Sequence, residues 1–245
     1  MALKLRHLFP RREYGEHGQH NFYRHISVEM LSTTFPQEIT HTRVLKDCDE
    51  EFKVFLTTME ALGEKLGPLL FQFGKFDKYA FKSLDDFLAR LVPFLKRLPK
   101  EHKFAVEIRN KDWLVPKLAD VLREHGVALT LIDQRWMPRP WEMKDKFDLI
   151  TADFTYVRWL GDRKGIEEQT TTWDKVIVDR QGDLSEWVSL LKKVQERRIM
   201  ILAFANNHYA GFGPGTVDLF RSLWGDGLPK PIIPPRMEKQ SSLFD

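Results

Sequence analysis

The feature that most constrains the fold of this 245-residue chain is its alternation of short apolar runs with helical stretches. PLLFQF (68–73), FAVEIRN (104–110) and RIMILAFANN (198–207) carry runs of apolar residues without a strict polar alternation. Such runs are typical of parallel strands that are buried on both faces. The segments 49–67 and 83–99 have the spacing of amphipathic helices. The alternation predicts an α/β fold of about six strand–helix units, fewer than the eight of a closed barrel.

Composition excludes several classes of protein. The single cysteine, Cys48, rules out a disulfide framework and favours a cytoplasmic protein. No apolar run approaches the ~20 residues that a membrane span needs, so we expect no membrane partner. The net charge of +3 is weak support for a polyanionic partner such as DNA. No GxGxxG follows the first strand, and no HxH, HExxH or CxxC spacing occurs, so we predict neither a cofactor nor a bound metal.

The chain is expected to form one domain with two extensions. Residues 1–21 are basic and polar, and we expect them to be poorly ordered. Residues 22–228 carry the alternating pattern and form the domain. Residues 229–245 are rich in proline and form a flexible tail. Two long loops, 134–150 and 164–181, are expected between the elements of the domain, and long loops of this kind are often functional.

Polar side chains gather where the predicted strands end. In a parallel barrel the carboxyl ends of all strands lie on one face, which carries the active site. We therefore expect these side chains, which are far apart in sequence, to converge on one ligand site. They are Glu107, Arg109 and Asn110 with Trp113, Asp133 with Trp136, Arg158 with Trp159, and Asn206 and Asn207 with His208.

The residue types at these positions suggest an anionic ligand. Arg109 and Arg158 can clamp a carboxylate or a phosphate through paired N–H groups. Asn206 and Asn207 offer neutral donors and acceptors for an oxyanion or a hydroxyl group. The tryptophans 113, 136 and 159 are expected to wall the site.

Acid–base groups are available at the same positions. Glu107 or Asp133 is the candidate general base, and His41 or His208 the candidate proton shuttle. The alternative is structural, because Glu107–Arg109 or Asp133–Arg158 pairs can also stabilise a barrel without touching a ligand.

Several segments of the chain resemble one known family. It is the YecE-like proteins, domain-of-unknown-function family 72, and the similarity spans residues 22–225. The resemblance implies a TIM-type (β/α)8 barrel and carries over no established reaction. The segments that carry it are FPQEITHTRVLKDCDEEF (35–52), LGEKLGPLLFQF (62–73), FAVEIRNKDWL (104–114), HGVALTLIDQRW (125–136), ADFTYVRWLG (152–161) and FANNHYAGFGPGTV (204–217). The residues that match its motifs are Glu29, Ser32, Thr33, His41, Gln72, Glu107, Arg109, Trp113, Asp133, Arg158, Asn206 and Asn207.

The beginning of the chain departs from the pattern of that family. The G-T-x-G-W-like first strand has no counterpart, and VEMLSTTF (28–35) resembles the second strand except at Leu31. PQEITH then follows at once, so the fold is expected to be a TIM-type barrel that is incomplete at its N-terminal end. Either a strand–helix unit is lost after residues 22–35, or these residues serve as the third strand. An impaired, truncated family member is therefore one alternative, and an open edge that pairs with a second copy is another.

The tail ends in QSSLFD, residues 240–245. Gln240, Ser242, Leu243 and Phe244 resemble the short motif by which bacterial repair and replication proteins bind the sliding clamp. Two apolar anchors on a flexible tether suit a preformed pocket. The alternative is that Leu243 and Phe244 fold back on the domain.

Together these observations favour a protein that binds a small anionic, phosphate-bearing ligand and performs acid–base or hydrolytic chemistry without a redox cofactor. The alternative function is a DNA-associated or nuclease-like protein that is recruited to the clamp through its tail.

Overall fold

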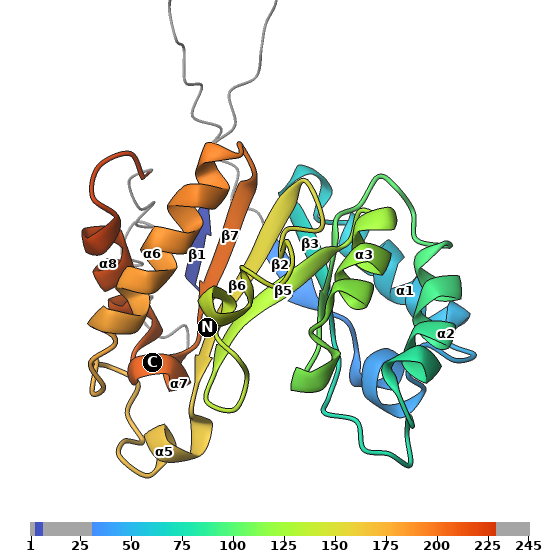
Figure 1. The fold of residues 1–245 in the computed structure, drawn as a ribbon, viewed down its shortest axis with the longest axis horizontal. Helices are drawn as coiled ribbons and strands as arrows, with labels where there is room; N and C mark the ends of the chain where they lie inside the picture. Colours follow the sequence, from blue (N-terminus) through green and yellow to red (C-terminus); the bar gives the residue numbers. More distant parts are fainter. Residues whose placement is uncertain (1–2, 7–30, 229–245) are drawn as a thin grey trace, which may run out of the picture.

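The architecture is an α/β fold built on one curled sheet (Figure 1). The computed structural model describes residues 3–6 and 31–228. In these residues seven strands follow the order β1-β7-β6-β5-β4-β3-β2. The six strands from β2 to β7 are parallel and form a half-barrel, and β1 is antiparallel to β7. The strands are β1 (Leu3–Arg6), β2 (Leu31–Thr34), β3 (Leu66–Gln72), β4 (Phe104–Glu107), β5 (Ala128–Gln134), β6 (Phe154–Gly161) and β7 (Met200–Ala205).

Helices cover the outer face of the half-barrel. Figure 1 shows α1, α2 and α3 beside one half of the sheet, and α6 and α8 beside β7. The longer helices are α1 (Asp49–Glu60), α2 (Leu84–Leu95), α3 (Pro116–Glu124), α6 (Gln181–Glu196) and α8 (Gly213–Trp224). The short ones are η1 (Glu38–Thr42), η2 (Gly63–Lys65), η3 (Lys111–Trp113), α4 (Pro140–Met143), α5 (Arg163–Glu167) and α7 (Asn207–Ala210).

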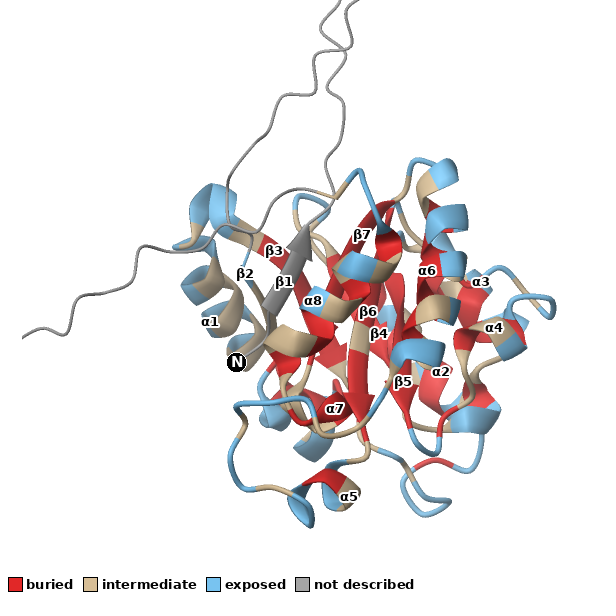
Figure 2. Ribbon diagram, turned by 90° about the vertical axis from the view of Figure 1, so that its left-hand side faces the viewer, coloured by how far each residue is buried: buried red, intermediate tan, exposed pale blue. Residues whose placement is uncertain are grey.

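Each strand from β3 to β7 buries both faces, as its continuous apolar sequence predicts. Figure 2 shows the strands as the most buried part of the molecule and the outer sides of the helices as exposed. The outer face packs against the helices, and there the rings of Phe35 and Phe71 stack with centroids 3.8 Å apart. The inner face carries a separate apolar cluster of Leu70, Ala105, Ala128, Phe154, Tyr156, Met200, Leu202 and Phe204. Successive residues therefore point to opposite faces of the sheet.

Local signals in the sequence place most helix ends. Ser83 caps α2, and its hydroxyl accepts a hydrogen bond from the Asp86 N–H at 3.2 Å. Helix α6 begins at Gln181. The Asp179 carboxylate accepts from the Gln181 N–H at 2.8 Å and supplies the start signal two residues ahead of the helix. The long loops 134–150 and 164–181 contain the short helices α4 and α5.

The fold differs from a full barrel at its N-terminal end, where β2 is the first of the parallel strands and lies at the edge of the sheet. This strand is parallel to β3 and leads directly into Pro36 and η1. The segment 28–35, which resembles the second strand of the family, is described only from residue 31 onward, and most of residues 1–21 and the tail from 229 also lie outside the described residues. No helix in the described ranges combines the length and the apolar composition needed to cross a bilayer.

Gly161 allows the end of β6 to approach α7 closely. Its backbone has φ of +69°, in the left-handed region. A Cβ at this position would lie 2.3 Å from the backbone oxygen of His208 and 2.5 Å from the Cα of Tyr209. Backbone atoms cannot rotate away as a side chain can, so only glycine fits between the two segments.

We predict that Gly161→Ala destabilises the fold by more than about 2 kcal/mol, because strain at positive φ adds to the clash with α7. Gly126→Ala is the matched control. Gly126 has a similar φ of +65° but no atom within 4 Å of the added Cβ. It should therefore cost only about 1 kcal/mol. Urea unfolding of both variants measures the difference, and equal losses would contradict the close approach.

Candidate functional site

The inner face becomes polar where the parallel strands end. In the register of the sheet, Gln72 lies opposite Glu107, and Arg158 lies between Ile132 and Phe204. Alternation from Ala105 puts both Glu107 and Arg109 on the inner face. Of the four strand ends that were expected to converge, those of β4 and β6 do so through Glu107, Arg109 and Arg158. The end of β5 joins them through Gln134 and not through the predicted Asp133, and the end of β7 lies apart.

Glu107 is the centre of this cluster. Its side chain is fully buried, and its Oε1 accepts hydrogen bonds from Nε and Nη2 of Arg109 at 2.5 Å. Its Oε2 accepts from Nη1 of Arg158, also at 2.5 Å. Arg109 Nη1 also donates to Oε1 of Gln134. One carboxylate from β4 thus holds two guanidinium groups, and Gln134 joins the end of β5 to them.

The cluster of Glu107, Arg109 and Arg158, called the arginine cluster below, carries more positive than negative charge. Two guanidinium groups face one carboxylate, which leaves one positive charge in excess. The side chains of Arg109 and Arg158 remain 14% and 20% exposed. Among the described residues, Nε and Nη2 of Arg158 have no hydrogen-bond partner. Within the described residues the cluster therefore has a partly exposed arginine with two donor nitrogens that make no hydrogen bond.

A second polar group on the inner face, the Thr130 hydroxyl, has no hydrogen-bond partner within the described residues. Thr130 is buried, with 5% of its surface exposed. β4 and β5 pair with Ala105 opposite Ala128 and Val106 opposite Leu129, so the next pair is Glu107 and Thr130. The Thr130 hydroxyl therefore lies in the same row as the buried carboxylate.

His41 reaches the same edge of the sheet from η1. A Cβ on Gly74 would lie 3.3 Å from Cδ2 of His41, so the imidazole ring occupies the space that a side chain at position 74 would fill. Position 74 continues β3 two residues beyond Gln72, which puts it beside Arg109 in register. His41 Nδ1 is hydrogen-bonded to Thr40 Oγ1 at 2.8 Å, and the residue is exposed.

Asp133 lies on the opposite face of the sheet from Glu107. Its Oδ2 accepts hydrogen bonds from the Trp187 indole N–H and the Tyr209 hydroxyl, both at 2.9 Å, and Oδ1 pairs with Arg139. The carboxylate is 1% exposed and ties β5 to α6 and α7. Burial raises the pKa of Tyr209, which keeps this donor protonated. The expected Asp133–Arg158 pair does not form, because the two side chains point to different faces.

The β7 end forms its own small network. Asn206 Oδ1 lies 3.0 Å from the His208 N–H, which donates to it, and 2.8 Å from Nδ1 of the His208 ring. His208 Nε2 lies 3.1 Å from Glu167, whose pKa is lowered mainly by the hydrogen bond from Arg163 and further by His208. Asn207 instead accepts from the Gly213 N–H at 2.8 Å and fixes the start of α8.

The three tryptophans that were expected to wall the site lie in different parts of the structure. Trp113 is buried in the outer core, where it stacks on Phe87 at 5.1 Å, and Trp159 is fully buried on the outer face. Trp136 is 53% exposed and follows the end of β5. Of the three, Trp136 alone is exposed, and it lies two residues beyond the end of β5.

Sequence reasoning missed Gln134 and Thr130. Thr130 was recoverable, because it shares with Ile132 the face of β5 opposite to Asp133. Gln134 follows an irregularity in the register after Asp133, and its bond with Arg109 places it at the inner face. Ser32, which matched a family motif, contacts Tyr156 with a hydroxyl–hydroxyl distance of 2.8 Å, and Thr33 pairs with Leu69. Glu29 and the tail residues Gln240, Leu243 and Phe244 lie outside the described residues. Within the part of the chain that the structure describes, no group of three His, Cys, Asp or Glu side chains is placed to hold a metal.

Comparison with known proteins supports this architecture. The sequence model of the family described as "Protein of unknown function DUF72" matches residues 30–240. A crystal structure of a DUF72 family protein from Thermotoga maritima has a TM-score of 0.57 and 23% identity over 78% of this chain and 71% of that chain. One from Enterococcus faecalis has a TM-score of 0.51 and 18% identity over 71% of this chain and 68% of that chain. Such identities establish likeness of fold alone. No curated protein matches the chain.

We predict that Glu107→Gln costs about 3–5 kcal/mol of stability, because it leaves two half-buried guanidinium groups without their counter-charge. Urea unfolding at neutral pH measures the loss. A loss below 1 kcal/mol would show that Glu107 does not hold the cluster together.

Asp148→Asn is the control, because Asp148 and Arg197 form a half-exposed surface pair at 2.8 Å. It should cost at most about 1 kcal/mol. The hydrogen bonds from Arg197 lower the pKa of Asp148. The stability from this pair is therefore present at neutral pH and lost as the pH falls through the lowered pKa, so the control and the wild type should converge in acid.

Proposed function

This chain belongs to the DUF72 family, and we propose that it binds a small anionic, phosphate-bearing ligand at the carboxyl ends of its inner-face strands. The observation that carries the proposal is the arginine cluster. Arg158 keeps two donor nitrogens without a partner in the described residues, while Glu107 fixes its orientation. Guanidinium groups held in this way bind phosphate oxygens in paired hydrogen bonds with little loss of entropy.

The acid–base chemistry in this proposal falls to His41. Among the candidates Glu107, Asp133 and His41, it is the exposed one. Both oxygens of Glu107 accept from arginines, so its role in the proposal is to position Arg109 and Arg158. Asp133 lies on the outer face, where it bonds β5 to α6 and α7. An imidazole beside a bound phosphate can donate a proton to a leaving group and thereby support hydrolysis.

In the fold that we propose, the half-barrel is the larger part of a TIM-type (β/α)8 barrel that is incomplete at its N-terminal end. Six consecutive parallel strands with helices on the outer face support it, as does the placement of polar groups at their carboxyl ends. An impaired family member is the competing interpretation, and the binding experiment below separates the two.

We predict that Arg158→Ala weakens the binding of inorganic pyrophosphate at least tenfold, because charge-assisted hydrogen bonds to charged groups contribute about 1.5–3 kcal/mol each. Isothermal titration calorimetry of the full chain measures the affinity. Arg197→Ala, which removes a surface arginine from a different pair, should bind as the wild type does. Wild-type protein that binds no pyrophosphate, inorganic phosphate or phosphate ester would overturn the proposal and favour an impaired protein.

His41→Asn separates binding from chemistry in the same experiment. The variant should retain pyrophosphate affinity while the hydrolysis of p-nitrophenyl phosphate falls at least a hundredfold, the usual contribution of a general acid or base. Hydrolysis that is unchanged in the variant would remove His41 from the mechanism without affecting the anion site.

A second candidate function rests on the tail sequence QSSLFD. We propose that Gln240, Leu243 and Phe244 bind a bacterial sliding clamp and so recruit the protein to DNA. A tether rich in proline favours the extended presentation of two apolar anchors to a pocket.

We predict saturable binding of a labelled PPRMEKQSSLFD peptide to purified sliding clamp in fluorescence polarisation. A peptide with Leu243→Ala and Phe244→Ala should not bind, because both anchors are lost. Equal signals from the two peptides, or none from either, would leave the chain without this recruitment function.

A further inference from the structure

We propose that the ligand of the arginine cluster carries a flat aromatic ring beside its anionic group, and that Trp136 stacks on this ring. The inference rests on the proposed anion site and deepens it, because it assigns the ligand to the class of nucleoside phosphates. Trp136 would then be a specificity-determining residue.

Trp136 lies at the tip of a tight turn that continues β5. The Met137 N–H donates to the Gln134 carbonyl at 3.0 Å, which closes a four-residue turn with Arg135 and Trp136 at its centre. Gln134, the first residue of the turn, accepts a hydrogen bond from Arg109. The turn that carries the indole is thus bonded directly to the arginine cluster.

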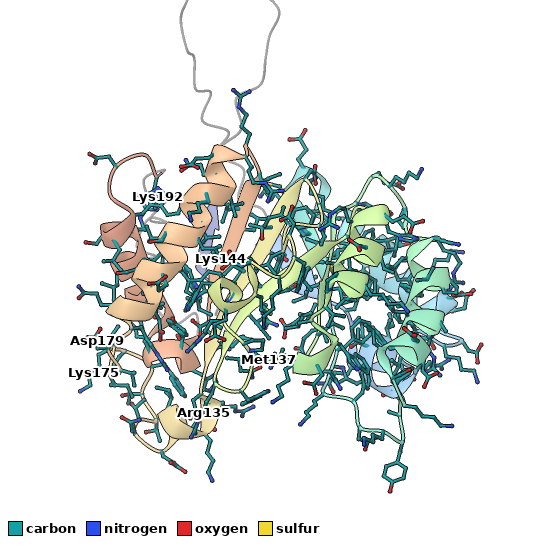
Figure 3. All side chains as sticks on the ribbon, viewed as in Figure 1. Arg135, Met137, Lys144, Lys175, Asp179 and Lys192 are labelled. Atoms are coloured by element: carbon teal, nitrogen blue, oxygen red, sulfur yellow. The ribbon has the colours of Figure 1, made fainter. Side chains whose placement is uncertain are left out.

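Both neighbours of Trp136 hold the turn in place at the ends of β5 and β6. Met137 is 5% exposed and packs with Ile132 and Leu160, which are inner-face residues of β5 and β6. Arg135 forms an ion pair with Asp162 at 2.7 Å. Figure 3 shows Arg135 and Met137 at the end of the molecule where α5 lies, which is the end that the carboxyl termini of the strands face.

The indole itself is left in solvent by this anchored turn. The exposed fraction of Trp136 is 53%, whereas Trp113, Trp159, Trp187 and Trp224 are buried. A large apolar surface gains free energy when it is covered, and a fixed turn loses little entropy when that happens. An aromatic ring that stacks on the indole covers this apolar surface, while the phosphate of the same ligand binds Arg158.

A phosphate at Arg158 and an aromatic ring on Trp136 together describe a nucleoside monophosphate better than a simple sugar phosphate.

The test compares AMP with ribose 5-phosphate, which has the same phosphate and sugar but no base. Calorimetry on the full chain should give an affinity for AMP at least tenfold above that for ribose 5-phosphate, as expected for one base–aromatic stack. Trp136→Ala should remove this preference and leave ribose 5-phosphate binding unchanged, while Trp136→Phe should retain part of it. AMP should also quench tryptophan fluorescence in the wild type and not in Trp136→Ala.

Tyr79→Ala is the matched control. Tyr79 is another exposed aromatic residue, but it follows β3, which is separated from β6 by β4 and β5 in the sheet. This variant should keep the preference for AMP. Equal wild-type affinities for AMP and ribose 5-phosphate, or a preference that survives Trp136→Ala, would overturn the stacking role while the anion site stands. Failure of both ligands and of pyrophosphate to bind would instead overturn the anion site itself.

Discussion

The buried carboxylate of Glu107 organises the polar edge of the half-barrel. A fully buried charge is tolerated when it is paired, and Glu107 is paired twice, with Arg109 from its own strand end and with Arg158 from β6. Arg109 then reaches Gln134 at the end of β5. β4, β5 and β6 are thus joined by side chains near their carboxyl ends. Within the described residues Nε and Nη2 of Arg158 make no hydrogen bond, so the arrangement that pairs Glu107 also supports the anion binding that we propose.

The two faces of the sheet divide the polar residues into two sets with different roles. Glu107 points inward to Arg109 and Arg158, whereas Asp133 points outward into a network with Arg139, Trp187 and Tyr209. Both carboxylates are buried and both are paired with arginine. The difference lies in the charge of the partners: Asp133 bonds two neutral donors and pairs with one arginine, while Glu107 pairs with two arginines, which leaves a positive charge in excess. The anion binding that we propose is therefore assigned to the inner face.

Much of the fold could be predicted from the sequence, because continuous apolar strands, capped helices such as that at Ser83 and six strand–helix units are local patterns. The convergence of Glu107, Arg109 and Arg158 also followed from parallel strands. The sequence pattern alone did not show on which face of the sheet each polar side chain lies. Asp133 and Gln134 are neighbours at the end of β5 but bond to groups on opposite faces of the sheet, and a rule based on strand ends alone treats them alike. The role of Gly161 also needed coordinates, because its constraint comes from the backbone of α7.

The most direct test of the central claim is a crystal structure of the full chain with pyrophosphate. The account predicts phosphate oxygens within hydrogen-bonding distance of Nη2 and Nε of Arg158, with Glu107 still bonded to both arginines. A pyrophosphate bound elsewhere, with the Arg158 donors occupied by other parts of the protein, would contradict it.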